Sequence, residues 1–320
     1  MKPTLYITRP LPENVVSAVR GHFDVTVREE TDPMSVAECI EVIGAYDAVL
    51  PTLRDPLSAE TLAQVAKPKS KILANFGVGY NHIDVAAAEA KGMVVTNTPG
   101  AVTDATSDIA LTLMLMTCRR AGEGERLLRA DQWTGWHPTQ LLGTHMTGKT
   151  LGVVGMGRIG KAIAKRAALG FDMKVVFFNR SKVEDPGVEA TQLDTLAEVA
   201  ATSDIVVVAV PATPATHHII NADVLAAMQS HAILVNIARG DVVDETALIE
   251  ALESGSIGGA GLDVYEFEPE VPSRLKAMEN VTLLPHLGTA ALEVRVSMGL
   301  MAVDNLIAWG EGRELPNRVA

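Results

Sequence analysis

Three residues with complementary chemistry lie in the second half of this 320-residue chain: Arg239, Glu268 and His286. Each follows a short apolar run of the kind that forms a buried strand, so each is expected just beyond the carboxyl end of that strand. In an open parallel sheet, ligands bind in the crevice outside those strand ends. The positions therefore predict a single site that combines a guanidinium, a carboxylate and an imidazole.

This combination suits the reduction of a 2-oxo acid. Arg239 stays charged, so it can hold a substrate carboxylate and polarise the neighbouring carbonyl. An imidazole titrates near neutral pH, so His286 can supply the proton, and Glu268 beside it would orient the ring. Taken singly, the three residues also fit a surface ion pair, a half-buried histidine and an acidic loop. Their joint placement favours the catalytic interpretation.

A glycine-rich segment indicates a nucleotide cofactor. It follows the apolar run at 151–154 and opens a helical pattern at 158–169, and a structural turn is the alternative. The first glycine permits a tight turn, the second lets the backbone approach a pyrophosphate, and the third lets helix pack on strand. Free N–H groups at the helix start favour phosphate. The cofactor-binding candidates here are Gly155, Met156, Gly157, Arg158, Ile159 and Gly160.

The residues after the next strand bear on which dinucleotide is bound. An enzyme that uses NAD usually has an acidic residue about 20 positions after the glycines. This chain has Asn179-Arg180-Ser181 there, with no carboxylate to repel a 2′-phosphate. Arg180 offers a guanidinium fork, and Asn179 and Ser181 can add hydrogen bonds. The sequence predicts that NADP(H) is preferred and NAD(H) possible, unless Arg180 is simply a solvated loop residue.

Two series of alternating strands and helices must position these residues. The alternation predicts an α/β fold with two doubly wound parallel sheets, a Rossmann cofactor domain and a flavodoxin-like substrate domain, with the active site in the cleft between them. Closure of the domains would exclude water. Expected strands are 4–7, 25–27, 48–50, 72–74, 151–154, 175–178, 205–208, 233–235, 261–264 and 281–284. Expected helices are 12–19, 35–43, 58–65, 104–120, 158–169 and 292–309, and residues 121–148 are expected to be irregular.

Because the last helix can return to the first domain, the predicted substrate domain is discontinuous, at 1–99 and 288–320, around a cofactor domain at 100–287. The net charge of −12 argues against broad contact with nucleic acid or an anionic membrane. Cys39 and Cys118 are too few for a disulfide framework and are expected to be ordinary core residues. With no secretory stretch and no long apolar run, a cytoplasmic location is expected.

With these motifs, the chain resembles a known family, the D-isomer-specific 2-hydroxyacid dehydrogenases. The resemblance runs over essentially the whole length, and the intervals between Arg239, Glu268 and His286 match as well. The segments that carry it are 75–84 (NFGVGYNHID), 152–160 (GVVGMGRIG), 235–240 (VNIARG), 261–264 (GLDV) with Glu268-Pro269, and 285–289 (PHLGT). Within the family, the chain looks most like glycerate dehydrogenases and glyoxylate/hydroxypyruvate reductases. Many relatives have an acidic residue near position 179, from which Asn179 departs.

The resemblance implies roles for individual positions. It implies that Arg239 binds the substrate and takes part in catalysis. It also implies that His286 contacts the substrate and acts as the acid–base residue, with Glu268 as its hydrogen-bond partner. It implies that Val78 and Gly79 bind the substrate carboxylate and that Asp263 contacts the nicotinamide carboxamide. Leu53 is a further candidate for shaping the substrate pocket. Additional residues expected along the cofactor are Thr106, Pro211, Ile237, Ala238 and Gly288.

The predicted activity is the reversible reduction of glyoxylate or hydroxypyruvate to glycolate or D-glycerate. Rivals on the same fold are oxidation of formate or phosphite, turnover of a bulkier 2-oxo acid, and a nucleotide-sensing corepressor. Trp133 and Trp136 suggest a homodimer contact, with packing against their own chain as the alternative. His217-His218 has no partner at metal-ligand spacing, so the sequence predicts a loop there and no metal.

Overall fold

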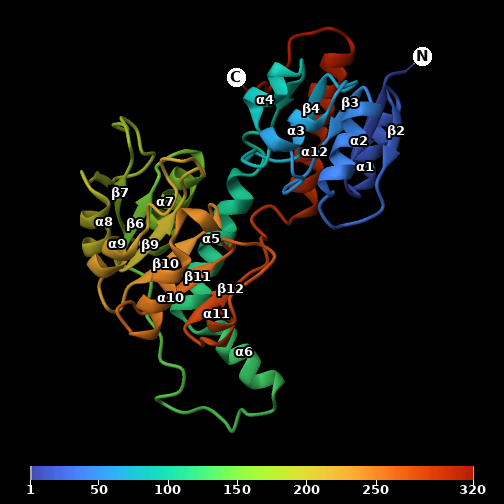
Figure 1. Cartoon of the computed structure of the whole chain (residues 1–320). Coiled ribbons are helices and arrows are strands. Elements are labelled where there is room, and N and C mark those ends of the chain that lie inside the picture. Colours follow the sequence, from blue (N-terminus) through green and yellow to red (C-terminus); the bar gives the residue numbers. More distant parts are fainter. Residues whose placement is uncertain (1, 320) are drawn as a thin grey trace. The chain divides into compact units, whose positions relative to one another are not determined.

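The computed structural model describes residues 2–319, which divide into two compact units. Unit 1 comprises residues 1–102 and 290–320, and unit 2 comprises residues 103–289. The predicted boundaries, at 99/100 and 287/288, lie within three residues of these. Each unit contains one sheet, and every strand pair in the two sheets is parallel, as the alternation of strands and helices predicts (Figure 1).

Unit 1 is a doubly wound sheet with the strand order β2-β1-β3-β4-β5. This is the flavodoxin-like order, in which the direction of winding changes between β1 and β3. Its strands are β1 (Thr4–Ile7), β2 (Asp24–Val27), β3 (Ala48–Leu50), β4 (Ile72–Ala74) and β5 (Val94–Thr96). Its helices are α1 (Glu13–Arg20), α2 (Val36–Ala45), α3 (Ala59–Gln64), α4 (Val85–Ala90) and α12 (Leu292–Gly310).

Helices cover both faces of this sheet. α2, α3 and α4 contribute to one core cluster, with Ile43 and Leu62 packed around the strand residues Val49 and Leu73. α12 packs against α1 and β4, so the carboxyl-terminal segment completes the unit. Gly299 makes this contact close, because a Cβ there would lie 2.3 Å from a methyl carbon of Val15.

Unit 2 has seven strands in the order β12-β11-β10-β9-β6-β7-β8. Counted from β6, this is the Rossmann order with one strand added beyond β11, and the winding direction changes between β6 and β9. The strands are β6 (Thr150–Val154), β7 (Lys174–Phe178), β8 (Thr191–Gln192), β9 (Ile205–Val208), β10 (Ile233–Asn236), β11 (Gly259–Leu262) and β12 (Val281–Leu283). The helices are α5 (Thr103–Cys118), α6 (Ala121–Arg129), α7 (Arg158–Phe171), α8 (Leu196–Thr202), α9 (Ala222–Ala227), η1 (Gly240–Val242), α10 (Glu245–Glu253) and α11 (Ser273–Ala277).

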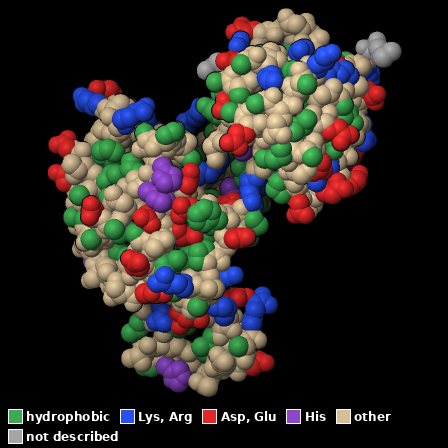
Figure 2. Space-filling view, viewed as in Figure 1, with side chains coloured by type: hydrophobic (Ala, Val, Ile, Leu, Met, Phe, Trp, Pro, Cys, Tyr) green, Lys and Arg blue, Asp and Glu red, His purple; other side chains and the backbone are tan. Residues whose placement is uncertain are grey.

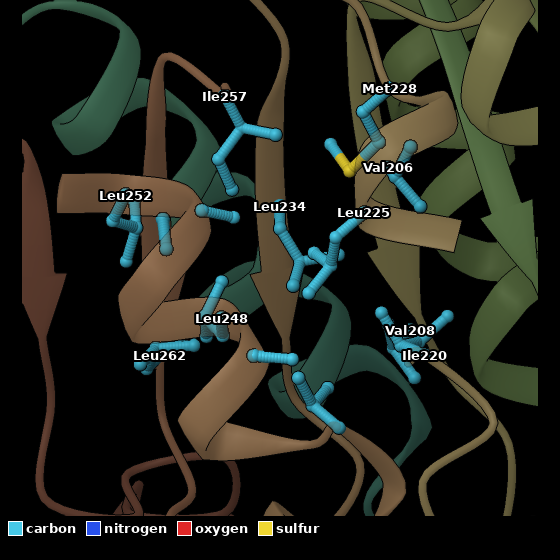
Figure 3. Packing of buried hydrophobic residues seen from close by; sticks show 14 of the residues in the cluster. Val206, Val208, Ile220, Leu225, Met228, Leu234, Leu248, Leu252, Ile257 and Leu262 are labelled. Atoms are coloured by element: carbon cyan, nitrogen blue, oxygen red, sulfur yellow. The ribbon is translucent and has the colours of Figure 1, made fainter. Parts of the chain in front are cut away.

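The two faces of this sheet bury separate apolar clusters. In one, Leu234 of β10 and Val206 of β9 meet Leu225 of α9 and Leu248 of α10 (Figure 3). The other lies under α5 and α7 and includes the fully buried Leu113. Because both faces are covered, the central strands are mostly apolar, which explains why the sequence shows them as short apolar runs.

Several predicted elements need correction. Residues 121–148 are not irregular throughout, because α6 occupies Ala121–Arg129 after a break at Arg120, whose φ is +52°. β11 ends at Leu262, two residues before the prediction, and β5 and β8 were not predicted. Cys39 and Cys118 are buried and unpaired, as expected. Among the described residues, the structure contains no helix with the length and apolar character needed to cross a membrane.

Candidate active site

Most of the predicted site residues lie in loops at one edge of the unit 2 sheet. Because all the strands are parallel, their carboxyl ends meet at the same edge. The glycine segment follows β6, Asn179 follows β7, Arg239 follows β10 and His286 follows β12. Asp263 directly follows β11, and Pro211 lies in the loop after β9. The sheet therefore gathers the cofactor and catalytic candidates of this unit along one rim.

The glycine segment has the geometry of a phosphate cradle. Gly155 has a φ of +97°, and a Cβ there would lie 2.9 Å from the carbonyl oxygen of Ala209. At Gly160 a Cβ would lie 2.1 Å from the carbonyl oxygen of Gly155, so only glycine lets α7 start this close to the turn. A Cβ at Gly157, in contrast, would have no described atom within 4 Å. Gly157 is the N-cap of α7 and, having no side chain, leaves the N–H groups of the first turn without a side-chain cap. The space and the N–H groups of the first turn fit a pyrophosphate.

The loop after β7 is held in place by side-chain amides. Asn179 Oδ1 accepts a hydrogen bond from Met156 N–H at 3.3 Å, and its Nδ2 donates to Ser181 O at 2.9 Å. Gln192 Nε2 donates to the carbonyl oxygens of Asn179 and Ser181 at 3.3 and 3.1 Å. Arg180 is exposed between them. Asn179 thus links this loop to the glycine segment, and the Arg180 side chain lies at the surface beside it.

His286 and Glu268 form a hydrogen-bonded pair. The Nδ1 atom of His286 lies 2.9 Å from Glu268 Oε2, and both side chains are partly buried. Burial raises the pKa of Glu268, but the hydrogen bond and charge of His286, the Tyr265 N–H and the charge of Arg239 together outweigh it, so the net pKa lies below the ordinary value. Tyr265 N–H also donates to Glu268, at 3.1 Å. With Nδ1 engaged by Glu268, Nε2 is the ring nitrogen available to a substrate.

The Asp263 carboxylate fixes the backbone that carries His286. Its Oδ1 accepts from Leu287 N–H at 2.6 Å and its Oδ2 from Gly288 N–H at 2.8 Å, while its carbonyl oxygen accepts from His286 N–H. Thr106 in α5 donates to Gly288 O at 3.1 Å. These bonds hold His286 at a φ of +55°, a left-handed conformation that costs a non-glycine residue about 1–3 kcal/mol. Burial raises the pKa of Asp263, against the effect of the two N–H donors.

Arg239 belongs to the same group of charges. Burial lowers the pKa of its guanidinium, whereas the negative charges of Glu268 and Asp241 raise it. An arginine remains protonated under these conditions. Arg239 Nη1 donates to Ala238 O at 2.7 Å, and Asn236 Nδ2 holds the Arg239 carbonyl at 2.9 Å. Glu268 therefore interacts electrostatically with both Arg239 and His286.

Two contacts at this rim were not predicted from sequence. Gly240 packs so closely on the next loop that a Cβ would lie 1.8 Å from the carbonyl carbon of Tyr265. Tyr265 OH donates to the carbonyl oxygen of Leu284 at 3.0 Å. These contacts tie together the loops that carry Arg239, Glu268 and His286. A glycine directly after Arg239 was the only sequence signal for this packing.

Leu53, Val78 and Gly79 lie in unit 1, after β3 and β4, and so at the carboxyl edge of the other sheet. Asn75 Nδ2 donates to Gly79 O at 3.0 Å, and Asn97 Nδ2 donates to Val78 O at 2.9 Å. Arg9 Nη1 donates to Leu53 O at 2.7 Å. Side-chain amides and a guanidinium therefore hold the carbonyl groups of this rim.

The Leu53 loop rests on a buried polar network at the β1/β3 switch point. Asp55 is fully buried and accepts from Thr8 Oγ1 at 2.6 Å, from Thr52 N at 2.8 Å and from Met34 N at 3.1 Å. The guanidinium of Arg9 lies 3.6 Å from the same carboxylate. The network fixes the loop that follows β3 without any contribution from the exposed side chains.

Comparison with known proteins agrees with this geometry. Residues 111–288 match the model of the D-isomer specific 2-hydroxyacid dehydrogenase family, NAD binding domain. This match covers more than half of the chain and contains the glycine cradle, Arg239, Glu268 and His286. The chain belongs to the D-isomer-specific 2-hydroxyacid dehydrogenases. It is therefore an NAD(P)-dependent oxidoreductase, and its two parallel-sheet units are the fold of that family.

Relatives of this dehydrogenase match along the full chain. A glyoxylate reductase of Korarchaeum cryptofilum is 43% identical, and the match covers 100% of this chain and 96% of the relative. A glyoxylate reductase of Pyrococcus furiosus is 41% identical with the same coverage. The crystal structure of an NADPH-dependent glyoxylate/hydroxypyruvate reductase of Sinorhizobium meliloti, in complex with NADP and malonate, is 36% identical. It has a TM-score of 0.88 and the match covers 100% of this chain and 97% of that one.

Proposed function

We propose that this dehydrogenase reduces glyoxylate to glycolate and hydroxypyruvate to D-glycerate, with NADPH as the preferred reductant. The observation that carries the proposal is the rim of unit 2, where the His286–Glu268 pair and Arg239 lie at the same sheet edge as the glycine cradle. The names of the full-length relatives from Korarchaeum cryptofilum and Pyrococcus furiosus support glyoxylate as a substrate. The Sinorhizobium meliloti structure supports hydroxypyruvate and NADPH.

Each residue of the rim has a defined task in this reaction. The nicotinamide of the bound cofactor supplies the hydride. Arg239 binds the substrate carboxylate and polarises the 2-oxo group, because its buried guanidinium is permanently charged. His286 donates a proton from Nε2 to the carbonyl oxygen, and Glu268 holds the ring in place through Nδ1. In unit 1, Val78 and Gly79 are proposed to bind the substrate carboxylate, with Leu53 beside them.

The glycine segment, with Asp263 and the neighbouring loops, would hold the dinucleotide. The pyrophosphate fits at Gly157 and the first turn of α7, where Arg158 is the first helical residue. We propose that Arg180 binds the 2′-phosphate, because β6 and β7 are adjacent and their carboxyl ends bring Arg180 beside the glycine segment. Thr106, Pro211, Ile237, Ala238 and Gly288 are proposed to line the remainder of the cofactor.

A steady-state substrate panel tests the activity. Glyoxylate, hydroxypyruvate and pyruvate are assayed with NADPH and with NADH by absorbance, and formate and phosphite are assayed in the oxidative direction. We expect the highest kcat/KM for glyoxylate or hydroxypyruvate with NADPH. Turnover of formate or phosphite without turnover of either 2-oxo acid would reject the proposed reaction, and the absence of any turnover would favour the corepressor alternative.

A matched pair of histidine variants tests the role of His286. Unit 2 contains a second histidine–carboxylate pair, in which His231 Nε2 lies 2.7 Å from Asp204 Oδ1. His231 and Asp204 precede β10 and β9, so this pair lies at the opposite edge of the same sheet. His286→Asn should lower kcat by about 10²–10⁴-fold, the usual contribution of general acid catalysis, and His231→Asn should leave it near the wild-type value. Equal effects of the two variants would remove His286 from its proposed role.

We also propose that the enzyme is a homodimer and that α6 with the following loop, residues 121–148, forms part of the contact. Figure 1 shows this segment projecting from unit 2. It exposes large apolar side chains, with Trp136 80% and Leu142 65% accessible to solvent, and Trp133 about half exposed. Exposed aromatic groups of this kind are typical of interfaces. A solution mass measurement should give twice the chain mass, and Trp136→Ser with Leu142→Ser should shift it toward the monomer. A wild-type monomer at all concentrations would contradict the proposal.

A cytoplasmic location is proposed from the cysteines. Cys39 and Cys118 are both buried and reduced in the structure, and burial raises the pKa of Cys39 to about 12 and that of Cys118 to about 11. Free buried thiols are typical of proteins from reducing compartments. Cell fractionation with an antibody against the chain tests the location.

A further inference from the structure

A cluster of two histidines and a glutamate lies on the surface of unit 2, apart from the residues assigned to the reaction. His217 and His218 are stacked, with ring centroids 3.9 Å apart, and His218 has a φ of +49°. His218 Nε2 lies 2.9 Å from Glu266 Oε1, although the two residues are 48 positions apart in sequence. One ligand atom from each of the three side chains lies within 4.8 Å of the others. Glu266 is therefore the third potential metal ligand beside the histidine pair, and its spacing in the sequence did not reveal it.

The backbone around the cluster is well fixed. His218 N–H donates to Asp241 O at 2.9 Å, and the next residues join a parallel bridge between Ile220 and Val243. Glu266 N–H donates to Glu245 Oε1 at 3.3 Å, which places a second, buried carboxylate beside the cluster. His217 is exposed, so its ring can turn toward a ligand. Figure 2 shows histidine and acidic side chains next to one another on the surface of this unit.

We propose that His217, His218 and Glu266 bind a divalent transition-metal ion of the zinc class. Imidazole nitrogen with carboxylate oxygen is a donor set that Zn²⁺ accepts, with water in the remaining position, whereas Mg²⁺ prefers oxygen ligands alone. Such an ion would lie between His218 Nε2 and Glu266 Oε1, in place of the hydrogen bond that now joins them. The nearby Glu245 carboxylate adds negative charge, which favours the binding of a cation by the cluster.

Binding requires only a small movement. With metal–ligand bonds of about 2.0–2.2 Å, tetrahedral ligands lie roughly 3.4 Å apart. The three ligand atoms lie within 4.8 Å of one another, so the most separated pair must approach by at most about 1.4 Å. The exposed His217 ring can supply that movement, and His218 Nε2 and Glu266 Oε1, now 2.9 Å apart, must separate by about half an ångström to reach the same spacing. Glu266 lies two residues before Glu268, so an ion held there also restrains the loop that carries the partner of His286.

Calorimetric titration of the whole enzyme with ZnCl₂, in a buffer free of chelators, tests the site. We expect one equivalent of Zn²⁺ to bind to the wild type, and an excess of MgCl₂ not to compete. His217→Ala and Glu266→Gln should each weaken Zn²⁺ binding by at least ~10-fold. This is the smallest loss typically seen when a residue that only orients a metal ligand is removed, and removal of a ligand itself should cost no less. His217→Ala changes an exposed side chain, so it keeps the test valid if Glu266→Gln perturbs folding.

Two control variants separate this site from other histidine–carboxylate pairs. His231→Asn removes the pair with Asp204, and His286→Asn removes the pair with Glu268. Both should bind Zn²⁺ as the wild type does. The proposal is overturned if the wild type binds no Zn²⁺, if His217→Ala binds it unchanged, or if binding is lost in either control variant and kept in His217→Ala. Because the readout is binding, failure of this proposal is independent of the proposed reductase activity.

Discussion

Two glycines of the cofactor segment should respond in opposite ways to the same added methyl group. At Gly157 a Cβ would meet no described atom within 4 Å, and φ is −80°, so alanine fits the folded chain. At Gly160 a Cβ would lie 2.1 Å from the Gly155 carbonyl oxygen, where it collides with rigid backbone. Gly157→Ala should therefore impair cofactor binding alone, and Gly160→Ala should impair folding.

The sizes of the two effects follow from these distances. Gly157→Ala should change the free energy of unfolding by no more than about 0.5 kcal/mol, as for a surface substitution. If the pyrophosphate contacts the backbone there, the methyl group overpacks the complex by about 1–3 kcal/mol, which weakens cofactor binding roughly 5- to 150-fold. Gly160→Ala should cost the fold a similar 1–3 kcal/mol or more. For a domain the size of unit 2, this lowers Tm by roughly 2–12 °C.

Fluorescence titration with NADPH gives the Kd, and scanning calorimetry of the cofactor-free protein gives Tm. The reasoning requires a weakened Kd with an unchanged Tm for Gly157→Ala, and a lowered Tm for Gly160→Ala. If Gly157→Ala binds NADPH as tightly as the wild type, the pyrophosphate does not lie against this residue and the cradle has been misassigned. An unchanged Tm for Gly160→Ala would mean that α7 can move away from the turn at no cost.

Three further predictions concern separate parts of the molecule. Arg180→Asp should lower the ratio of kcat/KM with NADPH to kcat/KM with NADH by about 10- to 100-fold, because it removes a charged hydrogen bond of about 1.5–3 kcal/mol. An unchanged ratio in steady-state assays would refute the proposed contact between Arg180 and the 2′-phosphate. The pKa of Glu268 is lowered in the folded state, so its pairing stabilises the protein above the ordinary value of 4.5 and is lost as pH falls through the lower value. In urea unfolding, the stability difference between wild type and Glu268→Gln should therefore shrink as pH falls below 4.5, and a constant difference would contradict this sign. Asp55→Ala removes the carboxylate that three buried donors share, after which Thr52 N–H keeps only Thr8 Oγ1 as a partner, and Thr8 Oγ1 keeps Thr52, at 3.1 Å. At about 1–3 kcal/mol for each donor left unsatisfied, such as Met34 N–H, the variant should lower the midpoint of urea unfolding more than Asp55→Asn does.

Much of the fold could be predicted because its strands are buried on both faces. β9 is apolar throughout, and β6 and β10 are apolar except for Thr150 and Asn236 at their ends, so all three carry a strong signal. β11 was misplaced because its sequence, Gly-Ala-Gly-Leu, has little strand propensity and forms a strand only where its glycines pack against Leu113 and Thr117 of α5. α6 was missed because two of its residues are glycines, and its ion pairs, such as Arg120–Glu123, depend on local geometry.

The site could be predicted as far as strand order determines it. Parallel topology brings Arg239, Glu268 and His286 to the same edge, and this follows from their positions after strands. Contacts between loops could not be predicted in this way. Gln192, which holds the loop of Arg180, and Glu266, which pairs with His218, reach their partners only through tertiary packing across many residues.

The order of the units along the chain has a consequence for synthesis on the ribosome. Unit 2 is one continuous segment, so the nascent chain contains all of it once residue 289 has left the exit tunnel. Unit 1 begins first but lacks α12, which packs on α1 and β4, until residues 292–310 have been made. Because domains fold as units, unit 2 should reach its native state first, and unit 1 should fold only after α12 has been made.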